Sequence, residues 1–157
     1  MTLPLSYKDR EQQKFVECPE SEVAVRVKVC NPEDISITPQ KGETASSGET
    51  ISAIKALYSN GVSVFLGDPN GSFQDASIIG ISITASTIGN EIRYLIDGIL
   101  FDSSLSFTNG EPVFLDIDGG LTQVDPAILG HTYRVLLGYA TGTNAININI
   151  QEPIQIN

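Results

Sequence analysis

Residues 109–124, NGEPVFLDIDGGLTQV, decide the fold class of this chain. They contain the turn signal Asn109-Gly110, a run over 112–117 that is apolar except for Asp116, the turn signal Asp118-Gly119-Gly120, and a shorter run over 121–124 that begins with Leu121 and ends with Val124. Asn-Gly and Asp-Gly between short apolar runs are strong hairpin signals, because these residues tolerate the positive φ of tight turns. The stretch therefore predicts two β-strands joined by a tight turn.

The same rhythm of short strands and turn residues runs from Ile51 to Asn157. Roughly eight to ten strands fit into this segment, a density typical of a small β-barrel or β-sandwich. We therefore predict an all-β domain over 51–157. The predicted strands are 51–58, 62–66, 77–86, 91–96, 99–102, 112–117, 121–124, 131–140 and 145–150. Asn60-Gly61 is the predicted hairpin turn between the first two, and Asp97-Gly98 is the predicted turn between 91–96 and 99–102.

The first 50 residues have a different composition. Residues 23–30, VAVRVKVC, alternate valine with other residues and predict one strand with a buried and a solvated face. Residues 6–16 are compatible with a short helix capped by Ser6, or with an arm that orders on a partner. Residues 31–50 are rich in Pro, Gly, Ser and Thr, and we interpret them as a linker that is flexible from Pro39 to Thr50. The predicted organisation is an arm and strand (1–30), a linker (31–50) and a β-domain (51–157).

Charge separates these parts further. Residues 42–157 hold three basic residues and twelve acidic ones, whereas residues 1–41 hold six basic and seven acidic. Nucleic-acid binding requires a Lys/Arg patch that neutralises phosphates, so a net charge of −10 argues against it. Anionic membrane surfaces are disfavoured for the same reason, and no apolar run is long enough to span a bilayer. No secretory signal peptide is visible at the N-terminus.

Two cysteines, Cys18 and Cys30, have a spacing that fits neither a redox CxxC motif nor a zinc knuckle. We expect two unpaired thiols in a reducing cytoplasm, with a disulfide between them as the alternative.

Motifs of known chemistry are weak in this sequence. Residues 68–72 and 116–120 have closely spaced oxygen ligands, as calcium loops do, but lack the full twelve-residue pattern, so turns are the better interpretation. His131, the single histidine, would have to serve any Ser/His/Asp triad, but no GxSxG motif accompanies it. We therefore expect a structural histidine at the start of a strand, no enzyme activity, and no metal or other cofactor.

The aromatic residues of the β-domain allow two interpretations. Core packing is the first, because aromatic side chains dominate small cores. The alternative is that exposed tyrosines contact a glycan or a protein. The residues concerned are Phe101, Phe107, Phe114, Tyr133 and Tyr139.

Residues 145–150, AININI, alternate isoleucine with asparagine. The asparagines either face solvent or form amide ladders between chains, as in β-fibres and intertwined trimers. In the second case the segment is an edge strand covered by a neighbouring subunit. The predicted oligomer interface consists of Ile146, Asn147, Ile148, Asn149 and Ile150.

The segment from Gly80 to Ile154 resembles the C-terminal domain of bacteriophage virion appendage proteins, which include head-fibre and tail-associated proteins. The resemblance, a rhythm of glycine, strand and turn, covers about half of the chain. It is carried by GISITAS (80–86), Asp97-Gly98, residues 109–126, YRVLLGYATG (133–142) and the ending ININIQEPIQI (146–156). Residues 6–17 and 24–29 look like the N-terminal segment of short phage structural proteins.

This resemblance implies a non-enzymatic virion component, made in the cytoplasm of the bacterial host and often trimeric. It implies partners among the capsid, neck or tail proteins of the phage, besides other copies of the chain. The N-terminal segment would dock on the particle through its apolar residues, which are Leu3, Leu5, Tyr7, Phe15 and Val16. An alternative function is a receptor- or glycan-binding module that contacts the host surface through its loops, such as 67–75 or 118–125.

Overall fold

The structure is a computed structural model, and it describes residues 40–157. The predicted arm, the valine-rich strand and both cysteines lie outside the described residues, as do the particle-attachment residues Leu3, Leu5, Tyr7, Phe15 and Val16.

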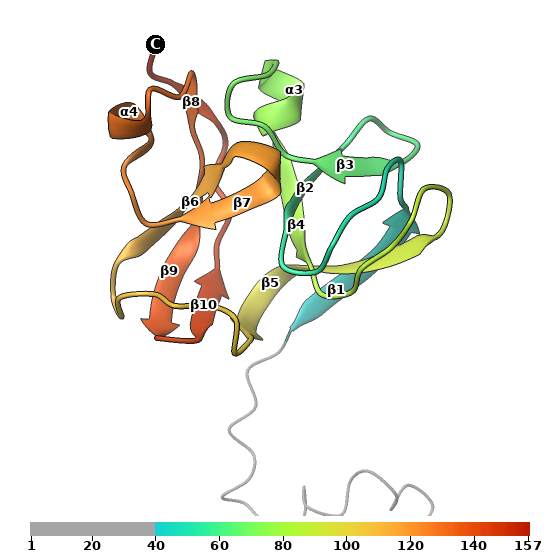
Figure 1. Cartoon of the computed structure of the whole chain (residues 1–157), viewed down its shortest axis with the longest axis horizontal. Helices are drawn as coiled ribbons and strands as arrows, with labels where there is room; N and C mark the ends of the chain where they lie inside the picture. Colours follow the sequence, from blue (N-terminus) through green and yellow to red (C-terminus); the bar gives the residue numbers. More distant parts are fainter. Residues whose placement is uncertain (1–39) are drawn as a thin grey trace, which may run out of the picture. The chain divides into compact units, whose positions relative to one another are not determined.

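The described residues form strands joined by short connections and three short helical turns (Figure 1). This confirms the predicted all-β class. The helical turns are α3 (Phe73–Ala76), η5 (Ile117–Gly119) and α4 (Pro126–Leu129). The strands are β1 (Lys41–Ser46), β2 (Ala56–Ser59), β3 (Val64–Leu66), β4 (Ile78–Ser82), β5 (Glu91–Phe101), β6 (Pro112–Asp116), β7 (Gly120–Thr122), β8 (Tyr133–Arg134), β9 (Leu136–Gly142), β10 (Ala145–Ile148) and β11 (Ile154–Gln155).

Nine of the strands make one antiparallel sheet in the order β3-β2-β4-β5-β10-β9-β6-β7, with β1 added along β5. The remaining two, β11 and β8, form a separate pair. The sheet curls so that its two ends approach each other, and the Gly119 N–H donates to the Gly67 carbonyl at 2.8 Å. No ladder between β3 and β7 forms within the described part of the chain.

Strand β5 corrects one of the predicted turns. Asp97-Gly98 was expected to separate two strands, but Glu91–Phe101 is one continuous strand of 11 residues. Gly98 has a positive φ of 102°, and the Asp97 carboxylate accepts its N–H at 2.8 Å. The dipeptide therefore bends the strand without reversing it, so that β5 pairs with β1 and β4 in its first half and with β10 in its second.

Strand β1 corrects the predicted linker. Pro39–Thr50 was interpreted as flexible, but residues 41–46 pair along β5 from Lys41 opposite Asp97 to Ser46 opposite Glu91. Ser47 and Gly48 then bond to Asn90 and Val64. The polar composition suits an edge strand whose side chains are mostly exposed, so residues 40–50 belong to the folded domain.

Two predicted tight turns are confirmed. Asn60-Gly61 joins β2 and β3, with the Asn60 side chain accepting the N–H groups of Val62 and Ser63, both at 2.9 Å. Asp118 and Gly119 join β6 and β7 with φ values of 53° and 66°. Two consecutive positive φ values are the requirement of a type I′ hairpin turn, which explains the Asp-Gly sequence.

The core has two clusters, one on each side of β5. The larger cluster includes Leu100, Val113, Leu137 and Ile146, and the smaller one is built around Leu57, Val64 and Ile92. No helix in the described part is long and apolar enough to cross a membrane.

Candidate binding surfaces

The predicted interface strand does not lie at an edge. β10 pairs with β5 on one side and with β9 on the other, so its backbone is fully engaged. Ile146 and Ile148 are buried in the larger core cluster, and Ile150 packs against it. The predicted edge position was therefore wrong, because period-two alternation does not show which strands lie beside a segment. Of the five predicted residues, Asn147 and Asn149 are exposed.

Loops that lie far apart in the sequence meet at one end of the domain, beside α3 and α4 (Figure 1). The Tyr133 N–H donates to the Pro69 carbonyl at 2.9 Å, and the Thr132 N–H donates to Asn70 Oδ1 at 2.9 Å. The rings of Phe73 and Tyr133 pack edge to face, with centroids 6.0 Å apart. The structure thus places residues 67–75 beside residues 131–133 and, through Gly67 and Gly119, beside the start of the 118–125 loop of the predicted receptor-binding alternative. Gln123, farther along that loop, bonds to Thr108.

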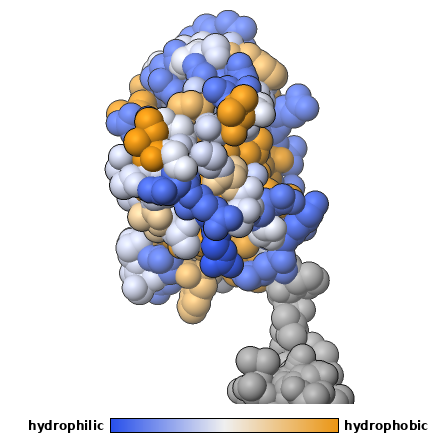
Figure 2. All heavy atoms as spheres, turned by 90° about the vertical axis from the view of Figure 1, so that its right-hand side faces the viewer, coloured by the Kyte–Doolittle hydropathy of each residue, from blue (hydrophilic) through white to orange (hydrophobic). Residues whose placement is uncertain are grey.

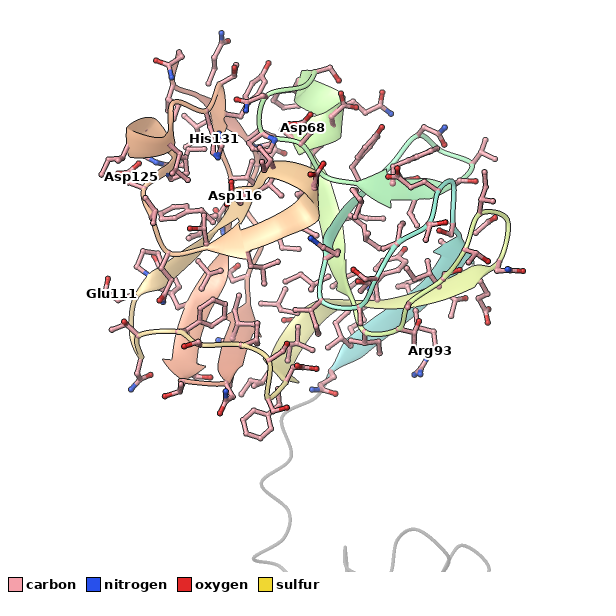
Figure 3. All side chains as sticks on the ribbon, viewed as in Figure 1. Asp68, Arg93, Glu111, Asp116, Asp125 and His131 are labelled. Atoms are coloured by element: carbon pink, nitrogen blue, oxygen red, sulfur yellow. The ribbon has the colours of Figure 1, made fainter. Side chains whose placement is uncertain are left out.

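His131 joins these loops (Figure 3). Its Nε2 lies 3.0 Å from Asp116 Oδ1 and its Nδ1 lies 3.3 Å from Asn70 Nδ2. The first contact suits a donating Nε2–H and the second an accepting Nδ1, which is one neutral tautomer. The ring is only 5% exposed, and side chains that are not nucleophiles occupy both of its nitrogens. The contacts of His131 are therefore those of a structural residue.

The loops that looked like calcium sites are held by their own hydrogen bonds. Asp68 Oδ1 accepts the Asn70 N–H at 2.8 Å, and Asp116 Oδ1 accepts the Ile117 N–H at 2.8 Å. No group of three His, Cys, Asp or Glu side chains in residues 40–157 is arranged to hold a metal ion. These carboxylates stabilise turns, as the turn interpretation predicts.

A shallow acidic depression lies between these loops and β3, lined by Glu49, Asp68, Asp75 and Asp118. Burial raises the pKa of Tyr58 at this site, and a hydrogen bond to Asp75 raises it further. The Ser72 N–H lowers the pKa of the Asp75 carboxylate, which completes the capping box of α3. The polar groups of this depression mainly make hydrogen bonds that stabilise the adjoining loops and α3.

Arg134 Nη2 donates to both carboxylate oxygens of Asp125, at 2.9 and 3.1 Å. The pKa of Asp125 is lowered, first by the Ala127 N–H that it caps and then by Arg134. The pair fixes α4 against β8. Arg93, by contrast, projects from the other half of the domain (Figure 3).

A different surface is unusually apolar. On the second half of β5 and on β10, β9 and β6, the residues that alternate with the core positions point outward. We call these outward residues the outer face; they are Ile99, Phe101, Pro112, Phe114, Leu136, Tyr139 and, on β10, Asn147. Cross-strand pairing places Ile99 opposite Asn147, Asn147 opposite Tyr139, and Tyr139 opposite Pro112. None of these seven residues is charged; Asp116, which ends β6 in the same alternation, contacts His131.

A groove of about 490 Å³ lies on this outer face. Pro112, Phe114, Leu136 and Tyr139 line it from the sheet, and residues 151–154 line it from the C-terminal segment. Phe101 is 75% exposed and Tyr139 46%, so the core interpretation was wrong for these two aromatic residues. The signal for this surface was the runs PVFL (112–115) and LLGYA (136–140), which do not alternate with polar residues.

No protein-family model matches the chain, and no curated protein matches it.

Proposed function

We propose that the chain is a bacteriophage virion structural protein, a decoration, fibre or tail-appendage subunit. Its N-terminal segment attaches it to the particle, and its β-domain is displayed outward as a homotrimer. Its partners are other copies of the chain and the capsid, neck or tail proteins of the phage.

The observation that carries this proposal is the polarity of the β-domain. Gln40, where the described domain begins, lies at one end, and its side chain donates to the carbonyl of Ile99. The loops around α3 and α4 gather at the opposite end (Figure 1). Such a domain suits attachment at one end and display of the other, as the resemblance to virion appendages implies.

The charge of the β-domain also supports the proposal that this domain is displayed on the surface of the particle. Residues 40–157 contain four basic and twelve acidic residues. A protein present in many copies on one particle benefits from such a charge, because like-charged domains resist nonspecific association.

Immunogold labelling of purified particles of the phage that encodes the chain tests this function. We expect label on the particle surface, and we expect deletion of residues 1–22 to abolish incorporation while far-UV circular dichroism still reports a β-domain. Particles that lack the chain would refute the virion role. Particles that incorporate the deletion variant would refute only the attachment assignment.

A second function, binding of a host receptor or glycan, is favoured by the meeting of the two candidate loops. Tyr, Asn and Asp residues gather there, including Tyr133, Asn70 and Asp118. Replacing the exposed loop residues Phe73 and Val124 with alanine should slow adsorption of particles to host cells. Val62→Ala, in the distant turn between β2 and β3, is the control. Unchanged adsorption of the loop variants would exclude this function.

A further inference from the structure

We propose that the outer face is the surface through which copies of this chain associate with each other. The inference rests on the homo-oligomer of the proposed function and names the surface that forms it. It differs from the predicted interface in that the contact is made by the outward residues of four strands rather than by the edge of one.

The first argument is that this part of the sheet is apolar on both sides. An antiparallel sheet with one solvated face alternates apolar and polar residues along each strand, whereas a sheet buried on both faces has continuous apolar runs. In β6, Val113 and Leu115 fill the core while Pro112 and Phe114 point outward. In β9, Leu137 fills the core while Leu136 and Tyr139 point outward. Contiguous apolar patches of this kind mark interaction sites.

Exposed apolar residues in the turns of the other half of the domain do not form such a surface. Val62 and Ile88 are 83% and 69% exposed, but they lie in separate turns of the other half of the domain. On the face shown in Figure 2, hydrophobic side chains appear as separated spots among polar ones. Isolated exposed residues are normal in soluble proteins, so the outer face is distinct from this background.

The second argument identifies the partner as a second copy. Residues 40–157 carry three acidic residues for every basic one, so two copies repel each other over most of their surface. The seven outer-face residues are uncharged, and the groove among them is also lined by one residue of each sign, Arg134 and Glu152. A basic partner would be attracted to the acidic surface of the rest of the domain rather than to the outer face. The outer face is better matched by a surface that is also uncharged, such as the outer face of a second copy.

The third argument is Asn147, in the middle of the outer face. Its side chain is exposed between Ile99 and Tyr139, and it makes no hydrogen bond to another described side chain. An amide both donates and accepts, so the Asn147 side chains of neighbouring copies can bond to one another where they meet. A single asparagine in an apolar interface also fixes the register of the contact.

Sedimentation velocity of the full chain tests the proposal, with wild type compared with Asn147→Asp and Phe101→Glu. Each variant would bring a carboxylate from every copy into the contact, whereas both sites tolerate a charge in a free chain because they are exposed. The control is Val62→Glu, which puts the same charge on a residue of similar exposure away from the outer face. Far-UV circular dichroism confirms that all variants fold.

We expect wild type and Val62→Glu to associate, and both outer-face variants to associate at least roughly tenfold more weakly or not at all, since like charges brought together in a contact oppose it. A wild type that stays monomeric at roughly 100 µM, the weak limit of a specific contact, would overturn the inference. Outer-face variants that associate like wild type would overturn it too. Either result leaves the immunogold test of the virion role unaffected, so the two failures are distinguishable.

Discussion

At the scale of single residues, Gly138 shapes the sheet that carries the outer face. In the pairing of β6 with β9, Val113 lies opposite Gly138 and Phe114 opposite Leu136, so Leu137 is an extra residue in β9. This bulge lets Leu137 and Ala140 both reach the core while Tyr139 points outward. A Cβ at Gly138 would lie 2.1 Å from the Asn147 carbonyl oxygen, so only glycine fits.

We therefore predict that Gly138→Ala lowers the free energy of unfolding by about 2–4 kcal/mol, because β9 and β10 must separate locally. Gly142→Ala, in the same strand, is the matched control, since no atom lies within 4 Å of the position that its added Cβ would take. It should change stability by less than about 0.5 kcal/mol. Urea unfolding at one protein concentration measures both. Equal stability of the two variants would show that the bulge is not constrained by Gly138.

At the scale of elements, side-chain contacts add to the backbone hydrogen bonds that hold the loop end together. The Asn70 side chain accepts the Thr132 N–H and contacts His131. His131 in turn contacts Asp116, the last residue of β6. Three segments distant in sequence therefore depend on one small polar network. A side-chain network of this kind can contribute more stability than the sum of its separate contacts.

Asn70→Ala is expected to cost about 1 kcal/mol, because the Thr132 N–H loses its acceptor. Amide hydrogen exchange should accelerate in residues 67–72 and 130–133, while the strands β5 and β10 keep their protection. Asn109→Ala, at an exposed turn position, is the control and should leave exchange unchanged. Exchange that stays slow in both loops would mean that the network does not hold them together.

At the scale of the whole molecule, net charge and the outer face have opposite effects on self-association. The net charge of −10 keeps copies apart, and the apolar outer face favours their contact. This balance gives association a particular dependence on salt, because screening weakens the long-range repulsion and leaves apolar burial intact.

We predict that raising NaCl from about 0.05 M to about 0.5 M strengthens self-association of the full chain severalfold, as the Debye length shortens to less than half. Sedimentation equilibrium at both salt concentrations measures the effect. An interface built on ion pairs would respond in the opposite direction. Weaker association at high salt would therefore exclude an uncharged outer face as the contact.

Some of the fold follows from local chemistry and was predictable. The turns at Asn60-Gly61 and Asp118-Gly119 were identified because few residue pairs tolerate the φ values of these hairpins. The same inference from turn residues was wrong at Asp97-Gly98, since a glycine with positive φ also permits a bend within a continuous strand. It was wrong for residues 41–46 as well, because a polar edge strand has the composition of a linker.

The sequence by itself determined the all-β class, the positions of several turns, and the alternation of Ile146 and Ile148 with Asn147. Only the tertiary structure decided that β10 lies between β5 and β9, that the two loops share one end, and that Phe101 and Tyr139 point outward. The physical reason is that turn preference and side-chain period are local properties of a few residues. Which strands become neighbours depends on contacts between residues distant in the chain, and those neighbours decide which of two apolar faces is buried.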